Sequence, residues 1–224
     1  LTRMELDASR RNTMKALASP NIIHGTIESA FPGPRERRLW RVDRISGSYY
    51  LLLLSRTQPD LSAAMEQFGP QGSGAALECR AYEPFLARLA EGDRCRFRLA
   101  ANPTRSCKSE DGEGRGTVRA HTTPEHQAAW LMRTCGECGF SLAPEQFAAV
   151  SSRWLRFRKG GRTASLLEAV FDGILTITDA PLFRRTLTEG IGRGKAFGMG
   201  LMTVARIGGE AASSGTVYYL TLEG

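Results

Sequence analysis

The sequence predicts an α+β fold of two tandem ferredoxin-like units, each with the element order βαββαβ and an antiparallel sheet. Short apolar runs with strand periodicity alternate with amphipathic helical stretches in that order. The same order begins again near Gly92 although no letters repeat, so the repeat is one of elements. The 224 residues also suffice for two units of about 100 residues each.

The first unit is predicted over residues 1–88. Its first helix is the best marked, because Ser19 is a candidate N-cap and Pro20 occupies the first helical position. In chain order we expect a strand at 1–6, this helix at 19–31, strands at 37–46 and 49–58, a helix at 59–69 and a strand at 75–84.

The second unit is predicted over residues 92–207. Its segments are a strand at 94–106, a long polar loop at 108–123, a helix at 124–139 opened by Pro124, strands joined by a basic turn at 151–178, a helix at 178–190 and a strand at 199–208. Residues 208–224 are predicted to be a C-terminal extension that follows a Gly/Ser/Ala linker.

The basic composition allows two explanations, a nucleic-acid partner or simply the composition of the surface. Lys and Arg total 30 against 23 Asp and Glu, for a net charge of +7, and Arg outnumbers Lys, which suits bidentate contacts to phosphate. No apolar run approaches the ~20 residues of a membrane span, and the first residues contain no apolar signal segment. We therefore expect a cytoplasmic protein with no membrane partner.

The cysteines favour neither a metal site nor a disulfide framework. They are odd in number and irregularly spaced, at Cys79, Cys95, Cys107, Cys135 and Cys138. The last two have C-x-x-C spacing, but a structural zinc site needs a second pair of ligands. The spacing is better explained as a turn at the end of a helix, and no metal is expected.

The stretch "GIGRGKAFGMGL" places five glycines around two basic residues, Arg193 and Lys195. A dinucleotide fingerprint fails because Phe197 stands at the sixth position counted from Gly192. A Walker loop fails because Ala196 follows the lysine. The loop joins a helix to a strand, so no small-molecule cofactor is expected, and Lys195 and Arg193 are candidates to face a phosphate of another kind.

A second basic stretch, "SSRWLRFRKGGR", is predicted to form a hairpin that binds RNA. Its basic residues are Arg153, Arg156, Arg158, Lys159 and Arg162. Strand alternation places Arg156 and Arg158 on one face, where they suit phosphates or guanine edges of a stem. A solvated edge strand protected by charge is the alternative. The aromatic signature of the RNA-recognition (RRM) sheet is missing, so stacking of bases on the sheet is not supported.

Five ordered stretches resemble the CasE-type CRISPR repeat endoribonucleases, the RNA-processing subunit of type I-E Cascade complexes. They are "HGTIESAFP" at 24–32, "RFRLAANPT" at 96–104, "QAAWL" at 127–131, "FDGILTITDAP" at 171–181 and "IGRGKAFGMGL" at 191–201. The resemblance implies tandem ferredoxin-like domains of the RAMP type that bind the hairpin of a CRISPR repeat transcript. It also implies metal-independent cleavage at the 3′ base of that hairpin by the RNA's own 2′-OH, with the product retained among the other Cascade subunits.

The resemblance makes His24 the candidate catalytic residue, since it stands where the family's catalytic His stands. Histidine is the natural proton carrier near neutral pH. Glu28 is its i, i+4 neighbour on the helix, and Asn21 occupies a position where the family has a Tyr. Tyr49 or Tyr50 is a possible substitute for that Tyr. Two other hypotheses stay open, a non-cleaving RNA-binding subunit of the same complex and an unrelated ferredoxin-like protein that binds a small ligand.

Overall fold

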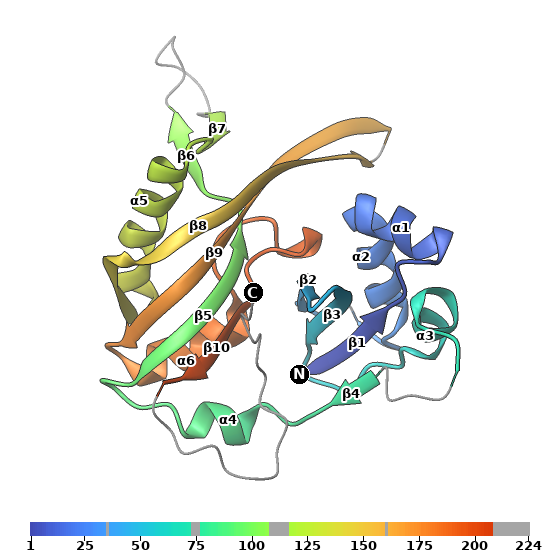
Figure 1. Ribbon diagram of the computed structural model, residues 1–224, viewed down its shortest axis with the longest axis horizontal. Helices are drawn as coiled ribbons and strands as arrows, with labels where there is room; N and C mark the ends of the chain where they lie inside the picture. The colour runs from blue at the N-terminus through green and yellow to red at the C-terminus, as the bar shows by residue number, and fades with distance from the viewer. Residues whose placement is uncertain (35, 73–76, 108–116, 160, 208–224) are drawn as a thin grey trace.

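Two antiparallel sheets of four strands each form the body of the protein (Figure 1). The computed structural model describes residues 1–34, 36–72, 77–107, 117–159 and 161–207, with the backbone alone at 158, 159 and 162. The extension predicted at 208–224 lies outside the described residues.

The N-terminal sheet has the strand order β2-β3-β1-β4. The elements of this unit are β1 (Thr2–Leu6), α1 (Arg11–Ala18), α2 (Pro20–Ser29), β2 (Leu39–Ile45), β3 (Ser48–Leu54), α3 (Ser62–Phe68), β4 (Leu77–Cys79) and α4 (Glu83–Ala87). Ile23 and Ile27, one turn apart on α2, pack in one buried cluster with Met4 and Leu53 of the sheet. Burial of these side chains fixes α2 on the sheet.

The C-terminal sheet repeats the arrangement with the order β10-β5-β9-β8. Its elements are β5 (Arg94–Ala101), β6 (Thr104–Cys107), β7 (Thr117–Ala120), α5 (Pro124–Cys135), the 3-10 turn η1 (Gly136–Cys138), β8 (Phe140–Lys159), β9 (Arg162–Ile177), α6 (Ala180–Glu189), the 3-10 turn η2 (Lys195–Phe197) and β10 (Met202–Arg206). Strands β8 and β9 are 20 and 16 residues long against 8 in β5, and their far halves leave the sheet and reach toward α1 (Figure 1). Both sheets therefore have the predicted ferredoxin-like order.

The local predictions were wrong for five elements. Helices α1 and α4 form where none was predicted, and β4 has three residues instead of the ten expected at 75–84. Residues 117–120, predicted as loop, form β7, which pairs with β6 along its whole length. The strand predicted at 94–106 is divided, because Pro103 has no N–H for the sheet and β6 leaves to make this separate two-stranded ribbon.

A buried arginine links the two sheets. Arg41 of β2 is 2% exposed, and its Nε and Nη2 donate to the two carboxylate oxygens of Asp43 at 2.8 and 2.7 Å. Its Nη1 donates to the backbone carbonyls of Arg98 and Leu201, both at 2.8 Å, and Nη2 also donates to the hydroxyl of Thr203 at 2.8 Å. All five guanidinium N–H groups therefore have acceptors. Three of these acceptors belong to the C-terminal unit.

The link continues into the C-terminal sheet through a second ion pair. Arg98 Nη1 lies 2.9 Å from Asp172 Oδ2, and Arg98 Nε lies 3.5 Å from Asp43 Oδ1. Burial raises the pKa of Asp172, against the charges of Arg98 and Arg41, which act to lower it. Two arginines and two aspartates thus balance each other between the sheets.

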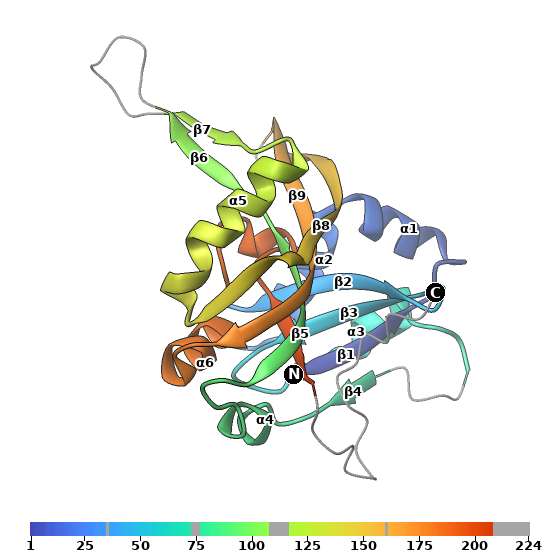
Figure 2. The same ribbon diagram turned by 60° about the vertical axis from the view of Figure 1, so that its left-hand side comes forward.

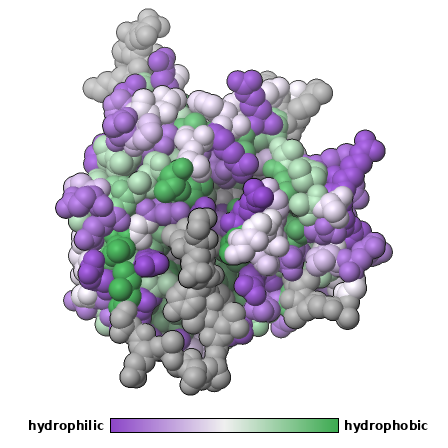
Figure 3. Space-filling model, viewed as in Figure 1, coloured by the Kyte–Doolittle hydropathy of each residue, from purple (hydrophilic) through white to green (hydrophobic). Residues whose placement is uncertain are grey.

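One face of the molecule is mostly polar. On the face seen in Figure 3, hydrophobic residues form small separate patches among hydrophilic ones. Within the described ranges, no helix has the length and apolar character needed to span a membrane.

We predict that Arg41→Ala lowers the free energy of unfolding by about 3–5 kcal/mol, because it leaves the Asp43 carboxylate buried without its partner. Arg44→Ala is the control, since this exposed arginine of the same strand lies 5.6 Å from the Tyr49 ring and its loss should cost about 1 kcal/mol or less. Urea unfolding measures both. Equal losses for the two variants would show that Arg41 does not hold the sheets together.

Candidate functional site

His24 lies where α2 meets the C-terminal unit. Ile23 and Ile27 of α2 face the core. The half-buried His24 therefore lies at the border between the buried and the exposed face of the helix. Its ring centroid is 6.4 Å from that of Phe197 in η2, with the two planes inclined by 54°. The helix thus presents an imidazole to the glycine-rich stretch of the other unit.

Phe197 joins His24 to the β8–β9 hairpin. Its ring centroid is 4.6 Å from that of Phe157 in β8, and Phe157 is buried with Leu155 and Met199 in a small cluster of its own. Phe197 therefore brings together the imidazole, the glycine loop and the outer part of the β8–β9 hairpin. Sequence reasoning missed Phe197 because it examined the loop for glycines and charges, and a single Phe among glycines has no periodicity to mark it.

The glycines of this loop serve close packing within the protein. A Cβ at Gly198 would lie 2.8 Å from the Trp40 ring, and one at Gly190 would lie 2.7 Å from Cδ2 of Leu39. Both residues have a positive φ, 85° and 77°, which side chains other than glycine rarely adopt. Because Leu39 and Trp40 belong to β2, the loop lies directly against the N-terminal unit. These two glycines therefore face the neighbouring unit.

The two basic residues of the loop differ in exposure. Arg193 is exposed and its backbone bridges to Asn102. Lys195 is half-buried in η2, and burial, followed by the charge of Arg37, lowers its pKa. Lys195 stands two residues before Phe197 in η2.

The basic hairpin presents its arginines on both faces. Arg153 is exposed, and its Nε lies 2.5 Å from Oε2 of Glu168 on β9. Arg156 is also exposed and stands opposite Ser165, with no ion pair to a carboxylate in the described part of the chain. Strand alternation places Arg153 on the face of Phe157 and Arg156 on the opposite face. The predicted contributions of the Arg158, Lys159 and Arg162 side chains lie outside the described residues.

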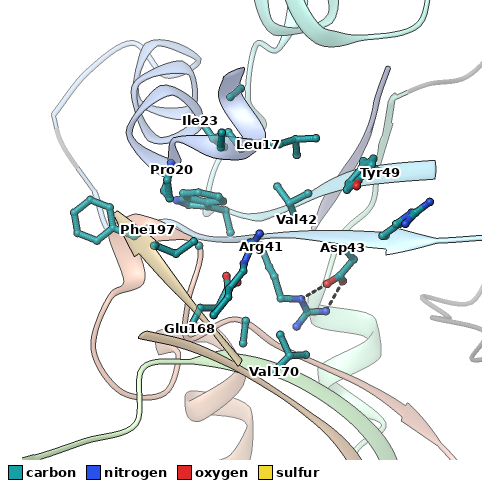
Figure 4. Close-up of a pocket in the computed structure, with 18 of the residues that line it drawn as sticks. Leu17, Pro20, Ile23, Arg41, Val42, Asp43, Tyr49, Glu168, Val170 and Phe197 are labelled. Carbon is teal, nitrogen blue, oxygen red and sulfur yellow. Dashed lines mark hydrogen bonds and ion pairs between the residues drawn. The ribbon is translucent and has the colours of Figure 1, made fainter. Parts of the chain in front are cut away.

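A cavity of about 510 Å³ opens between the two units beside Phe197 (Figure 4). Apolar side chains from α1, α2 and β2 line one side, and the charged lining residues are Arg41, Asp43, Arg44, Arg98, Arg153 and Glu168. Figure 4 shows Arg41 turned toward Asp43 inside it. Four arginines thus outnumber two carboxylates in the lining, although three of the four, Arg41, Arg98 and Arg153, make ion pairs with Asp43, Asp172 and Glu168.

Other predicted residues have different contacts. The Glu28 carboxylate lies 3.4 Å from Arg38 Nη1. Tyr49 and Tyr50, considered as substitutes for the Tyr replaced by Asn21, lie beneath the guanidinium groups of Arg44 and Arg3.

The cysteines remain thiols. Burial raises the pKa of the Cys138 thiol in the C-x-x-C segment. Burial also raises the pKa of the Cys95 thiol, to about 11. Within the ranges that the structure describes, no three His, Cys, Asp or Glu side chains are grouped to hold a metal ion.

Comparison with known proteins identifies the family. A family model described as "CRISPR associated protein" matches residues 1–206. The chain belongs to this family. Among curated relatives, the CRISPR-associated endoribonuclease Cse3 of Thermus thermophilus is 30% identical over 221 residues, which cover 92% of this chain and 99% of that protein.

A solved structure of Cse3 and a second curated relative extend the comparison. The structure of Thermus thermophilus Cse3 bound to an RNA representing a pre-cleavage complex superposes with a TM-score of 0.75 at 30% identity, over 91% of this chain and 97% of that one. The Cascade subunit CasE of Escherichia coli K12 is 30% identical over 115 residues, which are 49% of this chain and 56% of that protein. This family member therefore shares its fold with a protein solved on RNA.

We predict that Gly198→Ala destabilises the protein by about 1–3 kcal/mol more than Gly47→Ala. Both positions have φ between 85° and 88°, so both substitutions strain the backbone, but a Cβ at Gly47 meets no atom within 4 Å. The excess at Gly198 is the clash with Trp40, and urea unfolding measures it. Equal effects at the two sites would contradict the packing of the loop on β2.

Proposed function

We propose that this protein is an endoribonuclease that binds the hairpin of CRISPR repeat transcripts, cuts at the hairpin's 3′ base and stays on the product as a subunit of Cascade. The carrying observation is that similarity to an endoribonuclease extends over 92% of this chain and 99% of that relative. The similarity to a structure solved with a pre-cleavage RNA supports RNA binding, and the similarity to a Cascade subunit supports the assembly.

The reaction is a transesterification within the RNA. The 2′-oxygen at the cut site attacks the adjacent phosphorus while the bond from phosphorus to the 5′-oxygen breaks. The products are a 2′,3′-cyclic phosphate and a 5′-hydroxyl, and neither water nor an external nucleophile enters. One proton leaves the 2′-hydroxyl and one reaches the 5′-oxygen, so a proton carrier at the scissile phosphate supplies the protein's share of the chemistry.

His24 is that carrier in the proposed reaction. Phe197 flanks its ring on the side of the glycine loop, which limits the imidazole orientations available. Lys195 of η2 and the exposed Arg193 are the candidates to neutralise charge that builds on the phosphate in the transition state. The exposed arginines of the β8–β9 hairpin, Arg153 and Arg156, are the candidates to hold the stem.

A non-cleaving subunit is the second candidate, and Asn21 is the observation that favours it. Asn21 lies one turn before His24 on α2, and an amide donates hydrogen bonds but cannot act as an acid. Incubating the protein with a cognate repeat hairpin in EDTA separates the two. A product ending in a 2′,3′-cyclic phosphate supports the endoribonuclease, and intact but tightly bound RNA supports the non-cleaving subunit.

We predict that His24→Ala lowers the cleavage rate by about 10²-fold or more while the Kd for RNA stays near that of the wild type, because the imidazole moves protons and does not anchor the stem. Single-turnover cleavage and filter binding measure the two quantities. Ser29→Ala, on the exposed side of the same helix, should leave both unchanged. Loss of binding in His24→Ala would make His24 a structural residue and remove it from the chemistry.

A further inference from the structure

The β6–β7 ribbon places two arginines side by side. Arg105 and Arg119 stand directly opposite each other in the antiparallel register, and both are exposed. Like charges at such positions repel, and a two-stranded ribbon has little stability of its own to offset this. No carboxylate in the described ranges makes an ion pair with either arginine. An anionic partner would turn this repulsion into attraction.

More positive charge gathers at the root of the ribbon. Arg133 is an exposed residue of α5, the helix that follows the ribbon. His121, at the end of the ribbon, is 8% exposed, and its pKa is lowered first by burial and then by the charges of Arg133, His126 and Arg105. His121 itself is thus kept neutral, so the charge of this surface comes mostly from the arginines.

Some buried side-chain atoms at the root of the ribbon have no hydrogen-bond partner among the described residues. Among the described residues, six buried side-chain polar atoms have no partner, and three of them belong to Asn102, His121 and Gln127. Asn102 precedes the ribbon, and the Gln127 amide nitrogen donates to the His121 carbonyl at 3.0 Å. The unpartnered atoms are Asn102 Oδ1, His121 Nε2 and Gln127 Oε1. Asn102 Oδ1 and Gln127 Oε1 are acceptors, and all three atoms are shielded from solvent, so only the arginines of this surface can bind phosphate.

This surface faces the same side of the molecule as Arg156. The Gln127 amide of α5 also donates to the Ser152 hydroxyl of β8 at 3.0 Å, so Ser152 points toward α5. Strand alternation gives Trp154 and Arg156 the same direction, and Trp154 is 51% exposed. Figure 2 shows the ribbon and α5 on one side of β8 and β9, with α1 and α2 on the other.

We propose that the β6–β7 ribbon and the adjoining face of α5 form a second RNA-binding surface, in which Arg105, Arg119 and Arg133 bind backbone phosphates of the RNA held by the β8–β9 hairpin. The proposal rests on the proposed function for the identity of the RNA. Arginine suits this role because its planar group pairs with phosphate through two hydrogen bonds. Such contacts raise affinity and fix the direction in which the stem leaves the hairpin without reading its sequence.

The test is the salt dependence of RNA binding, measured with a repeat hairpin that carries a 2′-deoxy nucleotide at the cut site so that it cannot be cleaved. For Arg105→Gln/Arg119→Gln we expect weaker binding and a salt slope shallower by roughly 1.5–2 units, for two lost phosphate contacts. Arg105→Lys/Arg119→Lys keeps the charge and should retain most of the slope. Arg56→Gln/Arg88→Gln removes the same charge from exposed sites near β3 and α4, and its slope should match the wild type.

Two results would overturn the proposal. One is an unchanged salt slope in Arg105→Gln/Arg119→Gln. If that variant also loses a co-purifying Cascade protein, the ribbon is a contact for protein and not for RNA. The other is an equal loss in Arg56→Gln/Arg88→Gln, which would reduce the effect to net charge. Arg156→Gln reports on the hairpin alone. If it loses slope while the ribbon variant does not, the second surface fails and the proposed function stands; if the wild type does not bind the hairpin at all, the proposed function fails.

Discussion

The arrangement of this protein depends on one buried guanidinium. Arg41 crosses from the N-terminal sheet to carbonyls at Arg98 and Leu201 and to the hydroxyl of Thr203, while Asp43 neutralises its charge. Burying a charge is unfavourable unless every donor is satisfied, and arginine is the side chain with five donors in a rigid plane. A shift of one sheet past the other would break several of these bonds at once, so Arg41 fixes the register between the two units.

That register builds the candidate site. Trp40 precedes Arg41 on β2, and its ring fills the space that a side chain at position 198 would need. Gly198 follows Phe197, whose ring lies near the rings of His24 and Phe157. The imidazole belongs to one unit and its aromatic neighbours to the other, so its surroundings exist only while the units keep their relative position. Proton transfer needs such fixed geometry, since small misplacements of reacting groups cost much of the rate.

Periodicity and turn residues were enough to predict both βαββαβ units, because each strand and helix carries its own local pattern. They could not reveal β7, whose four residues become a strand through pairing with β6. The pattern around Arg41 resembles an ordinary exposed strand position, and one of its acceptors lies 160 residues away. At the site, His24 was identified by resemblance, whereas Phe197 and the packing role of Gly198 follow from contacts between units. Residues that act across the junction leave little local signal.

The most direct test of this dependence is the cleavage rate of Arg41→Lys at saturating repeat RNA, read beside its Kd. Lysine keeps the charge but has at most three donors, so the units lose part of their register while the exposed hairpin is untouched. If Arg41 sets the geometry around His24, Arg41→Lys has a single-turnover rate at least about 10-fold below that of the wild type, with the Kd changed by no more than about threefold. A variant that is folded and cuts at the wild-type rate would contradict the claim that Arg41 sets the geometry around His24.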